Sequence, residues 1–304
     1  MNVLVTGGAG FIGSHIVDLL VDKGCTVSVA DDLSTGRIEN INSGAKFYNI
    51  DVRDPGLQDV VARESPAAVV HLAAQVDVQR SLHDTRADAE INIIGAVNLL
   101  DACAGCGVGK VVFASSAAVY GNPVYLPVDE KHPMAPQSPY GLSKYTVEHY
   151  LRLYREMHGV NYTVLRFANV YGPRQDATGE GGVVAIFIDR LAKGVKPVIF
   201  GDGEQTRDFI YVKDVAGACA AALRRGDGGT YNVSTGKGLS VNHLYQALQA
   251  VTGSTLEAVY QPSRPGDIAH SVLVNAKACV SLDWRPRYIL AEGLRETVTF
   301  GASC

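Results

Sequence analysis

Tyr140 and Lys144 lie four residues apart in the stretch Ser138-Pro-Tyr-Gly-Leu-Ser-Lys144. Ser138 and Pro139 favour the start of a helix, as N-cap and as a first-turn residue. On that helix the phenol and the ammonium group would share one face. A free tyrosine, with a pKa of about 10, is a poor base at neutral pH, but a nearby cation lowers that pKa. The spacing is therefore compatible with Tyr140 as a general base assisted by Lys144, or with an ordinary surface contact.

The charge of Lys144 alone would not make Tyr140 a good base. A pKa shift of roughly 3 units corresponds to about 4 kcal/mol. One exposed ion pair contributes only about 0–1 kcal/mol. Burial and a bound oxidised cofactor would therefore have to contribute as well.

A pair of serines is predicted to lie near this tyrosine. Ser115 and Ser116 close the apolar run that begins at Lys110, which reads as a strand. Hydroxyl groups at the carboxyl end of such a strand point toward the ligand crevice of an open α/β sheet. Ser115 and Ser116 therefore strengthen the catalytic interpretation of Tyr140.

A glycine-rich turn near the N-terminus predicts a dinucleotide site. Gly7-Gly-Ala-Gly10-Phe-Ile-Gly13 satisfies the G-x-G-x-x-G pattern and lies between a predicted strand and a predicted helix. Glycines there permit a tight turn and let the backbone approach a pyrophosphate at the helix N-terminus. The next strand ends at Asp31-Asp32. A carboxylate there would accept hydrogen bonds from the adenine-ribose hydroxyls and would repel a 2′-phosphate. The pattern favours NAD over NADP, and the alternative is a purely structural turn.

The elements that would position these residues alternate between strands and helices. Alternation of this kind favours a parallel sheet, and the Val-rich strands fit burial on both faces. The predicted strands are Val3–Val5, Val27–Ala30, Phe47–Ile50, Ala68–His71, Lys110–Ser115 and Tyr162–Phe167. The predicted helices are Phe11–Val21, Leu57–Glu64, Ala89–Ala104 and Tyr140–Met157.

The pattern of predicted helices and strands changes after Gly172. Helices are predicted near Val183–Ala192, Val215–Leu223, Val241–Val251 and Leu290–Phe300, and short strands near Pro197–Phe200 and Phe209–Val212. The fold class is therefore α/β, with a Rossmann-type doubly wound parallel sheet and a smaller mixed α/β C-terminal substrate domain. We expect residues 1–172 to form the NAD-binding domain and 173–304 the substrate domain, with about 209–223 able to return to the first.

Composition excludes several classes of protein. The net charge of −4 over 304 residues argues against a nucleic-acid binder, and no apolar run is long enough to span a membrane. The N-terminus has no basic region before an apolar stretch, so we expect a cytoplasmic protein. Cys103 and Cys106 form the only C-x-x-C pair, without the second pair that a structural zinc site would need. We expect no metal site and favour helix-end packing over a redox role for this pair.

Taken together, the glycine turn, Asp31, the serine pair and Tyr140-x-x-x-Lys144 resemble the extended short-chain dehydrogenase/reductase family. The resemblance covers essentially the whole chain and is greatest to its UDP-glucose 4-epimerase branch. It is carried by Asp31-Asp-Leu-Ser-Thr-Gly36, His71-Leu-Ala-Ala74, Ser115-Ser-Ala-Ala-Val-Tyr-Gly121, Pro136-Gln-Ser-Pro-Tyr-Gly141 and Gly201-Asp-Gly-Glu-Gln-Thr-Arg-Asp208, the last followed by Phe209-Ile-Tyr-Val-Lys-Asp214.

The resemblance implies roles for individual residues. Tyr140 would be the base, Lys144 would bind the nicotinamide ribose, and Ser116 would hydrogen-bond the sugar 4-hydroxyl. The implied cofactor residues are Gly7, Gly10, Phe11, Ile12, Gly13, Asp31, Asp32, Ser34, Thr35, Gly36, Asp51, Val52, Leu72, Ala73, Ala74, Asn92, Ser115, Tyr140, Lys144 and Phe167. The implied substrate residues are Ser116, Asn169, Val183, Val184, Phe200, Arg207, Arg264 and Asp267.

The implied activity is NAD-dependent 4-epimerisation of a UDP-hexose, UDP-galactose or UDP-glucose, through a transient 4-keto intermediate. Tightly held NAD would then be a catalyst that is not consumed. Dehydratases of this family usually carry an Asp-Glu pair where this chain has Ala117-Ala118. Epimerisation of UDP-glucuronate, decarboxylation of a UDP-uronic acid and a non-catalytic dinucleotide-sensing module remain alternatives.

Two further features concern breadth and assembly. Ser271 takes the place of a bulky tyrosine that limits the sugar pocket in restrictive relatives, so an N-acetylated sugar is a possible substrate. The resemblance also implies a homodimer formed through helices such as Ala89–Ala104 and Tyr140–Met157. The sequence does not identify the physiological sugar.

Overall fold

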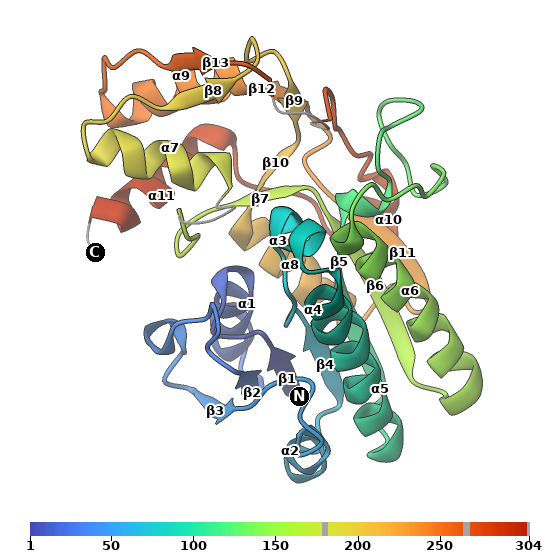
Figure 1. Ribbon diagram of the computed structural model, residues 1–304. Helices are drawn as coiled ribbons and strands as arrows, with labels where there is room; N and C mark the ends of the chain where they lie inside the picture. Colours follow the sequence, from blue (N-terminus) through green and yellow to red (C-terminus); the bar gives the residue numbers. More distant parts are fainter. Residues whose placement is uncertain (178–181, 264–267, 303–304) are drawn as a thin grey trace.

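The computed structural model describes residues 1–177, 182–263 and 268–302. Its centre is a seven-stranded parallel sheet in the order β11-β6-β5-β4-β1-β2-β3 (Figure 1). The strands are β1 (Asn2–Thr6), β2 (Thr26–Asp31), β3 (Ala45–Asn49), β4 (Ala68–His71), β5 (Lys110–Ser116), β6 (Asn161–Phe167) and β11 (Gly229–Val233). The predicted fold class, a doubly wound parallel sheet, is confirmed.

Helices cover both faces of this sheet because its central strands are buried on both sides. Val3, Val5 and Val70 face one apolar cluster, while Leu4 and Val69 face another, as the alternation of a strand requires. The first face is covered by α1 (Phe11–Asp22), α8 (Val212–Ala222) and α10 (Ala276–Ser281). The second is covered by α2 (Leu57–Glu64), α5 (Gly95–Gly105) and α6 (Pro139–His158).

A third apolar cluster lies in the C-terminal part of the chain. Figure 1 shows the helices of this part above the sheet. The helices of the cluster are α7 (Val183–Ala192), α9 (Val241–Thr252) and α11 (Leu290–Ala302). Three two-stranded sheets accompany them: β7 (Asn169–Tyr171) with β10 (Phe209–Tyr211), β8 (Val198–Phe200) with β13 (Val259–Gln261), and β9 (Thr206–Arg207) with β12 (Leu239–Ser240).

The structure differs from the sequence-based elements in several places, and the sequence did not predict β7, β9, β12, β13 or α10. β11 was not predicted, because Gly229-Thr-Tyr-Asn-Val233 is short and follows a glycine-rich run. Val212 begins α8 and does not end the preceding strand. The helix predicted at Ala89–Ala104 contains a π-turn at Glu90–Ile94 between α4 (Thr85–Ala89) and α5, preceded by the short α3 (Val78–His83).

The structure also bears on the predictions about membrane spans and about Cys103 and Cys106. No helix in the described ranges is long and apolar enough to cross a membrane. Cys103 is buried in α5, burial raises the pKa of its thiol to about 12, and Cys106 caps the end of the same helix. Both observations about the cysteines fit helix-end packing.

Candidate active site

The glycine turn joins β1 to α1 at the carboxyl edge of the sheet. Gly7 has a φ of +72°, and a Cβ there would lie 2.6 Å from the backbone nitrogen of Ala73. A Cβ on Gly13 would lie 2.0 Å from the carbonyl oxygen of Gly7. Glycine is therefore required at Gly7 by the segment that follows β4, and at Gly13 by the turn itself.

The N-terminus of α1 is suited to an anion. Gly10 is its N-cap residue and supplies no side-chain hydrogen bond to the first turn, which contains no acidic residue. The first backbone N–H groups and the positive end of the helix dipole are thus left for a ligand. The residues present fit the pyrophosphate of NAD, which Gly7, Gly10, Phe11, Ile12 and Gly13 would hold.

The carboxylate of Asp31 ends β2 beside this turn. Its Oδ2 accepts from the backbone N–H of Ala9 at 2.9 Å, and its Oδ1 from that of Leu33, also at 2.9 Å. Burial raises the pKa of Asp31, and these two hydrogen bonds oppose the shift. A Cβ on Gly36 would lie 2.7 Å from Oδ1, so the loop holding Ser34, Thr35 and Gly36 folds closely over Asp31.

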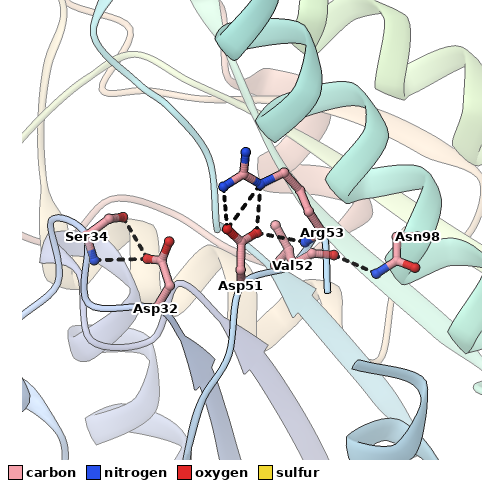
Figure 2. A network of polar contacts seen from close by, with 6 residues as sticks. All are labelled: Asp32, Ser34, Asp51, Val52, Arg53 and Asn98. Carbon is pink, nitrogen blue, oxygen red and sulfur yellow. Dashed lines mark hydrogen bonds and ion pairs between the residues drawn. The ribbon is translucent and has the colours of Figure 1, made fainter. Parts of the chain in front are cut away.

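Figure 2 shows the polar groups at the ends of β2 and β3. Oδ1 of Asp32 accepts from the backbone N–H and the hydroxyl of Ser34, at 2.9 and 2.6 Å. Arg53 holds Asp51 through both carboxylate oxygens and lowers its pKa. The carbonyl of Val52 accepts from Nδ2 of Asn98 at 2.7 Å, and its side chain is buried. Val52 would therefore meet adenine through its backbone.

Ser115 and Ser116 end β5 and point in opposite directions, as neighbours on a strand must. The hydroxyl of Ser115 donates to Oε1 of the buried Glu148 at 2.6 Å. Oγ of Ser116 instead accepts from the backbone N–H of Ala118 at 3.2 Å, where the chain turns toward α6. Only Ser116 is placed beside Tyr140, with which it forms a side-chain hydrogen bond.

Tyr140 and Lys144 occupy the first two turns of α6, as predicted. Oγ of Ser138 caps the helix by accepting from the N–H of Gly141 at 3.1 Å. Nζ of Lys144 is buried, donates to the carbonyl of Ala114 at 3.0 Å, and lies 5.9 Å from the centre of the Tyr140 ring. The carboxyl end of β5 and the start of α6 thus bring Ser116, Tyr140 and Lys144 together.

The pKa of Tyr140 departs from the sequence-based expectation. Burial raises it, Asp88 raises it further, and the hydrogen bond with Ser116 lowers it. Burial also lowers the pKa of Lys144 to about 8. The expectation that burial helps to lower the pKa of Tyr140 is therefore wrong, because desolvation of the phenolate is the largest effect and raises that pKa. The positive charge of oxidised NAD would have to supply the decrease.

The remaining predicted cofactor residues also follow strand ends. Leu72 and Ala73 both donate their backbone N–H to the carbonyl of Thr6, which ties the end of β4 to the glycine turn, and Ala74 follows them. Phe167 ends β6 and is buried. Asn92 lies in the π-turn, where its side chain bonds both backbone groups of Gln75.

The predicted substrate residues lie in the C-terminal part or at its border. Asn169 begins β7 and is exposed, Phe200 ends β8, and Nη1 of Arg207 in β9 donates to the carbonyl of Thr206 at 2.9 Å. Val183 and Val184 form the first turn of α7. Val184 is buried in the apolar cluster there, so it would contact a ligand only through its backbone. Arg264 and Asp267 lie outside the described residues.

Comparison with known proteins identifies the family. The model of the NAD-dependent epimerase/dehydratase family matches residues 3–234. This chain belongs to that family. It is similar to a UDP-glucose 4-epimerase from Mycolicibacterium smegmatis, with 43% identity over 307 residues, 99% of this chain and 98% of the relative. Family membership makes this chain an enzyme and NAD its cofactor.

Two solved structures of epimerases have nearly the same fold. UDP-glucose 4-epimerase from Thermotoga maritima, solved with UDP-glucose, has a TM-score of 0.97 and 45% identity, covering 100% of this chain and 99% of the other. UDP-glucose 4-epimerase from Thermus thermophilus, solved with NAD, has a TM-score of 0.95 and 44% identity, covering 100% of both chains.

Sequence reasoning missed two buried polar groups of this epimerase/dehydratase site. One is Asp88, which acts electrostatically on both Tyr140 and Lys144. The other is the ion pair of Glu148 with Arg166, in which Glu148 accepts a hydrogen bond from the hydroxyl of Ser115. Asp88 lies four residues before Asn92, and Glu148 four residues after Lys144. Both Asp88 and Glu148 thus lie one helical turn from a predicted site residue. That spacing was the sequence signal that could have revealed them.

Proposed function

We propose that this enzyme interconverts UDP-galactose and UDP-glucose by NAD-dependent 4-epimerisation through a transient 4-keto sugar. The observation that carries the proposal is the gathering of Ser116, Tyr140 and Lys144 at the carboxyl edge of the sheet that also carries the glycine turn. The similarity to UDP-glucose 4-epimerases over the full chain supports it. Dehydration is disfavoured because Ala117 and Ala118, which follow Ser116, cannot transfer protons.

The residues of the chain would act on the proton of the 4-hydroxyl. When bound, NAD would supply the hydride chemistry at C4 of the sugar. Tyr140 would take the hydroxyl proton as that carbon is oxidised and return it after the sugar has rotated. Ser116 would hold the C4 oxygen by a hydrogen bond, and Lys144 would hold positive charge next to the phenolate.

The remaining predicted roles belong to the same proposal. Asp31 would bind the adenine ribose, and Asp51 and Val52 the adenine. Arg207, with Arg264 and Asp267, would bind the UDP moiety, and the fork of an arginine suits its diphosphate. Asn169, Val183, Val184 and Phe200 would complete the substrate site.

Product analysis of the purified enzyme without added NAD tests the proposal. Conversion of UDP-galactose to UDP-glucose is expected, with NAD remaining bound through dialysis. Ready loss of NAD on dialysis would count against an epimerase. Interconversion of UDP-glucuronate and UDP-galacturonate, without turnover of UDP-galactose, would place the enzyme on the uronate branch.

We also propose a homodimer formed through α5, α6 and the π-turn. Exposed apolar side chains on these elements support it: Ile94, Leu142, Leu153 and Met157, with exposed fractions of 57, 53, 41 and 69%. A mass of about twice 32.3 kDa by light scattering is expected, and a monomer would contradict the proposal.

We propose a cytoplasmic location, where the described cysteines would stay reduced. Cell fractionation would test this location.

A further inference from the structure

Four buried polar side chains form a cluster behind the turn of α6 that carries Tyr140 and Lys144. Asp88 lies in α4, Asn92 in the π-turn, Gln75 after β4 and Ser143 in α6, with exposed fractions of 1, 3, 6 and 2%. Nε2 of Gln75 and Nδ2 of Asn92 both donate to Oδ1 of Asp88, each at 3.1 Å. Side-chain amide groups that donate in this way suit an ionised carboxylate.

The cluster is joined to α6 through Ser143. Nδ2 of Asn92 lies 3.1 Å from Oγ of Ser143, and that hydroxyl donates to the carbonyl of Tyr140 at 2.9 Å. Asn92 thus connects the carboxylate of Asp88 to Ser143, the residue that lies directly before Lys144.

The charge of Asp88 opposes the effect of burial on Lys144. Nζ of Lys144 is buried and bonds the neutral carbonyl of Ala114, so its positive charge is poorly compensated by that contact. Burial lowers the pKa of Lys144, and the negative charge of Asp88 raises it. Asp88 is the one acid that acts on Lys144 in this way among the described residues.

Other titratable groups around the cluster do not replace Asp88. His71 on β4 is neutral, because burial lowers its pKa to about 3. Glu148 on α6 is paired with Arg166. The remaining charged or titratable side chains of α3, α4 and the π-turn lie at the surface: Arg80, His83, Asp84, Arg86 and Glu90.

We propose that Asp88 is a positioning residue for the catalytic pair. Its charge keeps the buried ammonium group of Lys144 protonated, and its bonds through Ser143 and Asn92 fix the helix turn from which Tyr140 and Lys144 project. The inference rests on the proposed function, in which Tyr140 is the base.

The direction of the expected effect follows from the charges. Asp88 raises the pKa of both Tyr140 and Lys144, so its neutralisation lowers both. Tyr140 would then ionise, and Lys144 would lose its proton, at lower pH. Both limbs of the pH–rate profile should therefore move in the acid direction.

The test compares Asp88→Asn with Glu90→Gln in the purified enzyme with its bound NAD. Glu90→Gln removes the same charge two residues away, from a side chain at the surface. Tyr140 is titrated by the ultraviolet absorbance difference between each protein and the same protein carrying Tyr140→Phe. The profile of kcat against pH is measured in parallel.

We expect Asp88→Asn to move the titration midpoint and the kcat profile by about one unit to lower pH. Glu90→Gln should leave both in place. An unmoved midpoint in Asp88→Asn, or an equal shift in Glu90→Gln, would overturn the inference. If Asp88→Asn does not fold, Asp88→Ser provides a smaller neutral variant.

Ser143→Ala separates positioning from charge. It removes the hydroxyl link and keeps the carboxylate, so it should lower kcat without moving the pH profile. An unchanged kcat would overturn the positioning part of the inference. Failure of the wild-type enzyme to convert UDP-galactose would refute the proposed function alone, because the absorbance titration of Tyr140 does not depend on the substrate.

Discussion

The carboxyl edge of the large sheet and the small sheets of the C-terminal part are built differently. At the edge, β5 and β6 pair over seven residues, and each strand end places a site residue beside its neighbour's. In the C-terminal part, β9 and β12 pair over two residues and β8 and β13 over three. The first region is positioned by long backbone ladders, and the second by short pairings between distant segments.

Side-chain hydrogen bonds compensate for the short ladders of the second region. The buried Asp208 accepts from the backbone N–H and the hydroxyl of Thr235, at 2.9 and 2.6 Å, and from the N–H of Gly236 at 2.9 Å. One carboxylate thus joins the segment after Arg207 to the loop after β11. We expect changes at the sheet edge to affect chemistry and NAD, and changes in the second region to affect the choice and affinity of the sugar nucleotide.

The largest effect is expected at Tyr140. Tyr140→Phe removes the proton acceptor and should lower kcat by about 10³-fold, within the usual range for general base catalysis. Bound NAD and the melting temperature should stay near their wild-type values. Tyr150→Phe, a change of the same kind on the same helix, is the control. Activity within tenfold of wild type in Tyr140→Phe would exclude it as the base.

The next effect concerns the glycine turn. Gly7→Ala and Gly24→Ala both place a Cβ on a residue with φ near +70°, which costs about 1 kcal/mol of stability. Only at Gly7 does the Cβ meet a neighbour, Ala73, so a further 1–3 kcal/mol is expected there, at roughly the cost of overpacking. Gly7→Ala should also lose NAD on gel filtration. Equal unfolding free energies for the two variants would show that the turn relaxes away from Ala73.

Arg207 tests the second region. Arg207→Gln should raise KM for the sugar nucleotide by about 10–100-fold, the loss expected for hydrogen bonds to a charged group. NAD content and kcat should change little, because the substitution removes ground-state binding. Arg207→Lys keeps the positive charge but not the fork of the guanidinium group. Its KM should therefore lie between those of the wild type and Arg207→Gln. A main effect on kcat would mean that Arg207 acts at the sheet edge and would weaken the contrast between the regions.

The smallest effect is expected at Ser271. Its backbone N–H bonds the carbonyl of Thr206 at 3.0 Å, which places it beside Arg207. Ser271→Tyr should suppress turnover of UDP-N-acetylglucosamine, if the wild type has it, and leave UDP-galactose turnover within about threefold, since added bulk excludes only the larger sugar. Relative rates on the two substrates are the measurement. Equal losses on both would refute the role of this residue in the pocket.

Much of the sheet edge could be predicted because its determinants are local. Valine-rich strands and amphipathic helices alternate over the first half, and glycine, aspartate and serine mark the strand ends. The four-residue spacing of Tyr140 and Lys144 needed only the helix that Ser138 caps.

The unpredicted features depend on contacts far apart in the sequence. β11 becomes a strand by pairing with β6, more than 60 residues earlier. The raised pKa of Tyr140 depends on burial and on Asp88 from another helix. Val184 follows the helical pattern of α7, but the sequence did not reveal that its side chain is buried in the core. Each of these is decided by tertiary packing and not by local pattern.

The place of β11 has a consequence for synthesis on the ribosome. The edge of β6 is covered only when residues 229–233 arrive, after β7, β8, β9 and β10 have been made. A nascent chain that ends near residue 172 carries six of the seven strands of the sheet and an unpaired strand edge, which is an aggregation hazard. Vectorial folding from the N-terminus therefore cannot finish the sheet early, and about three quarters of the chain must emerge before it closes.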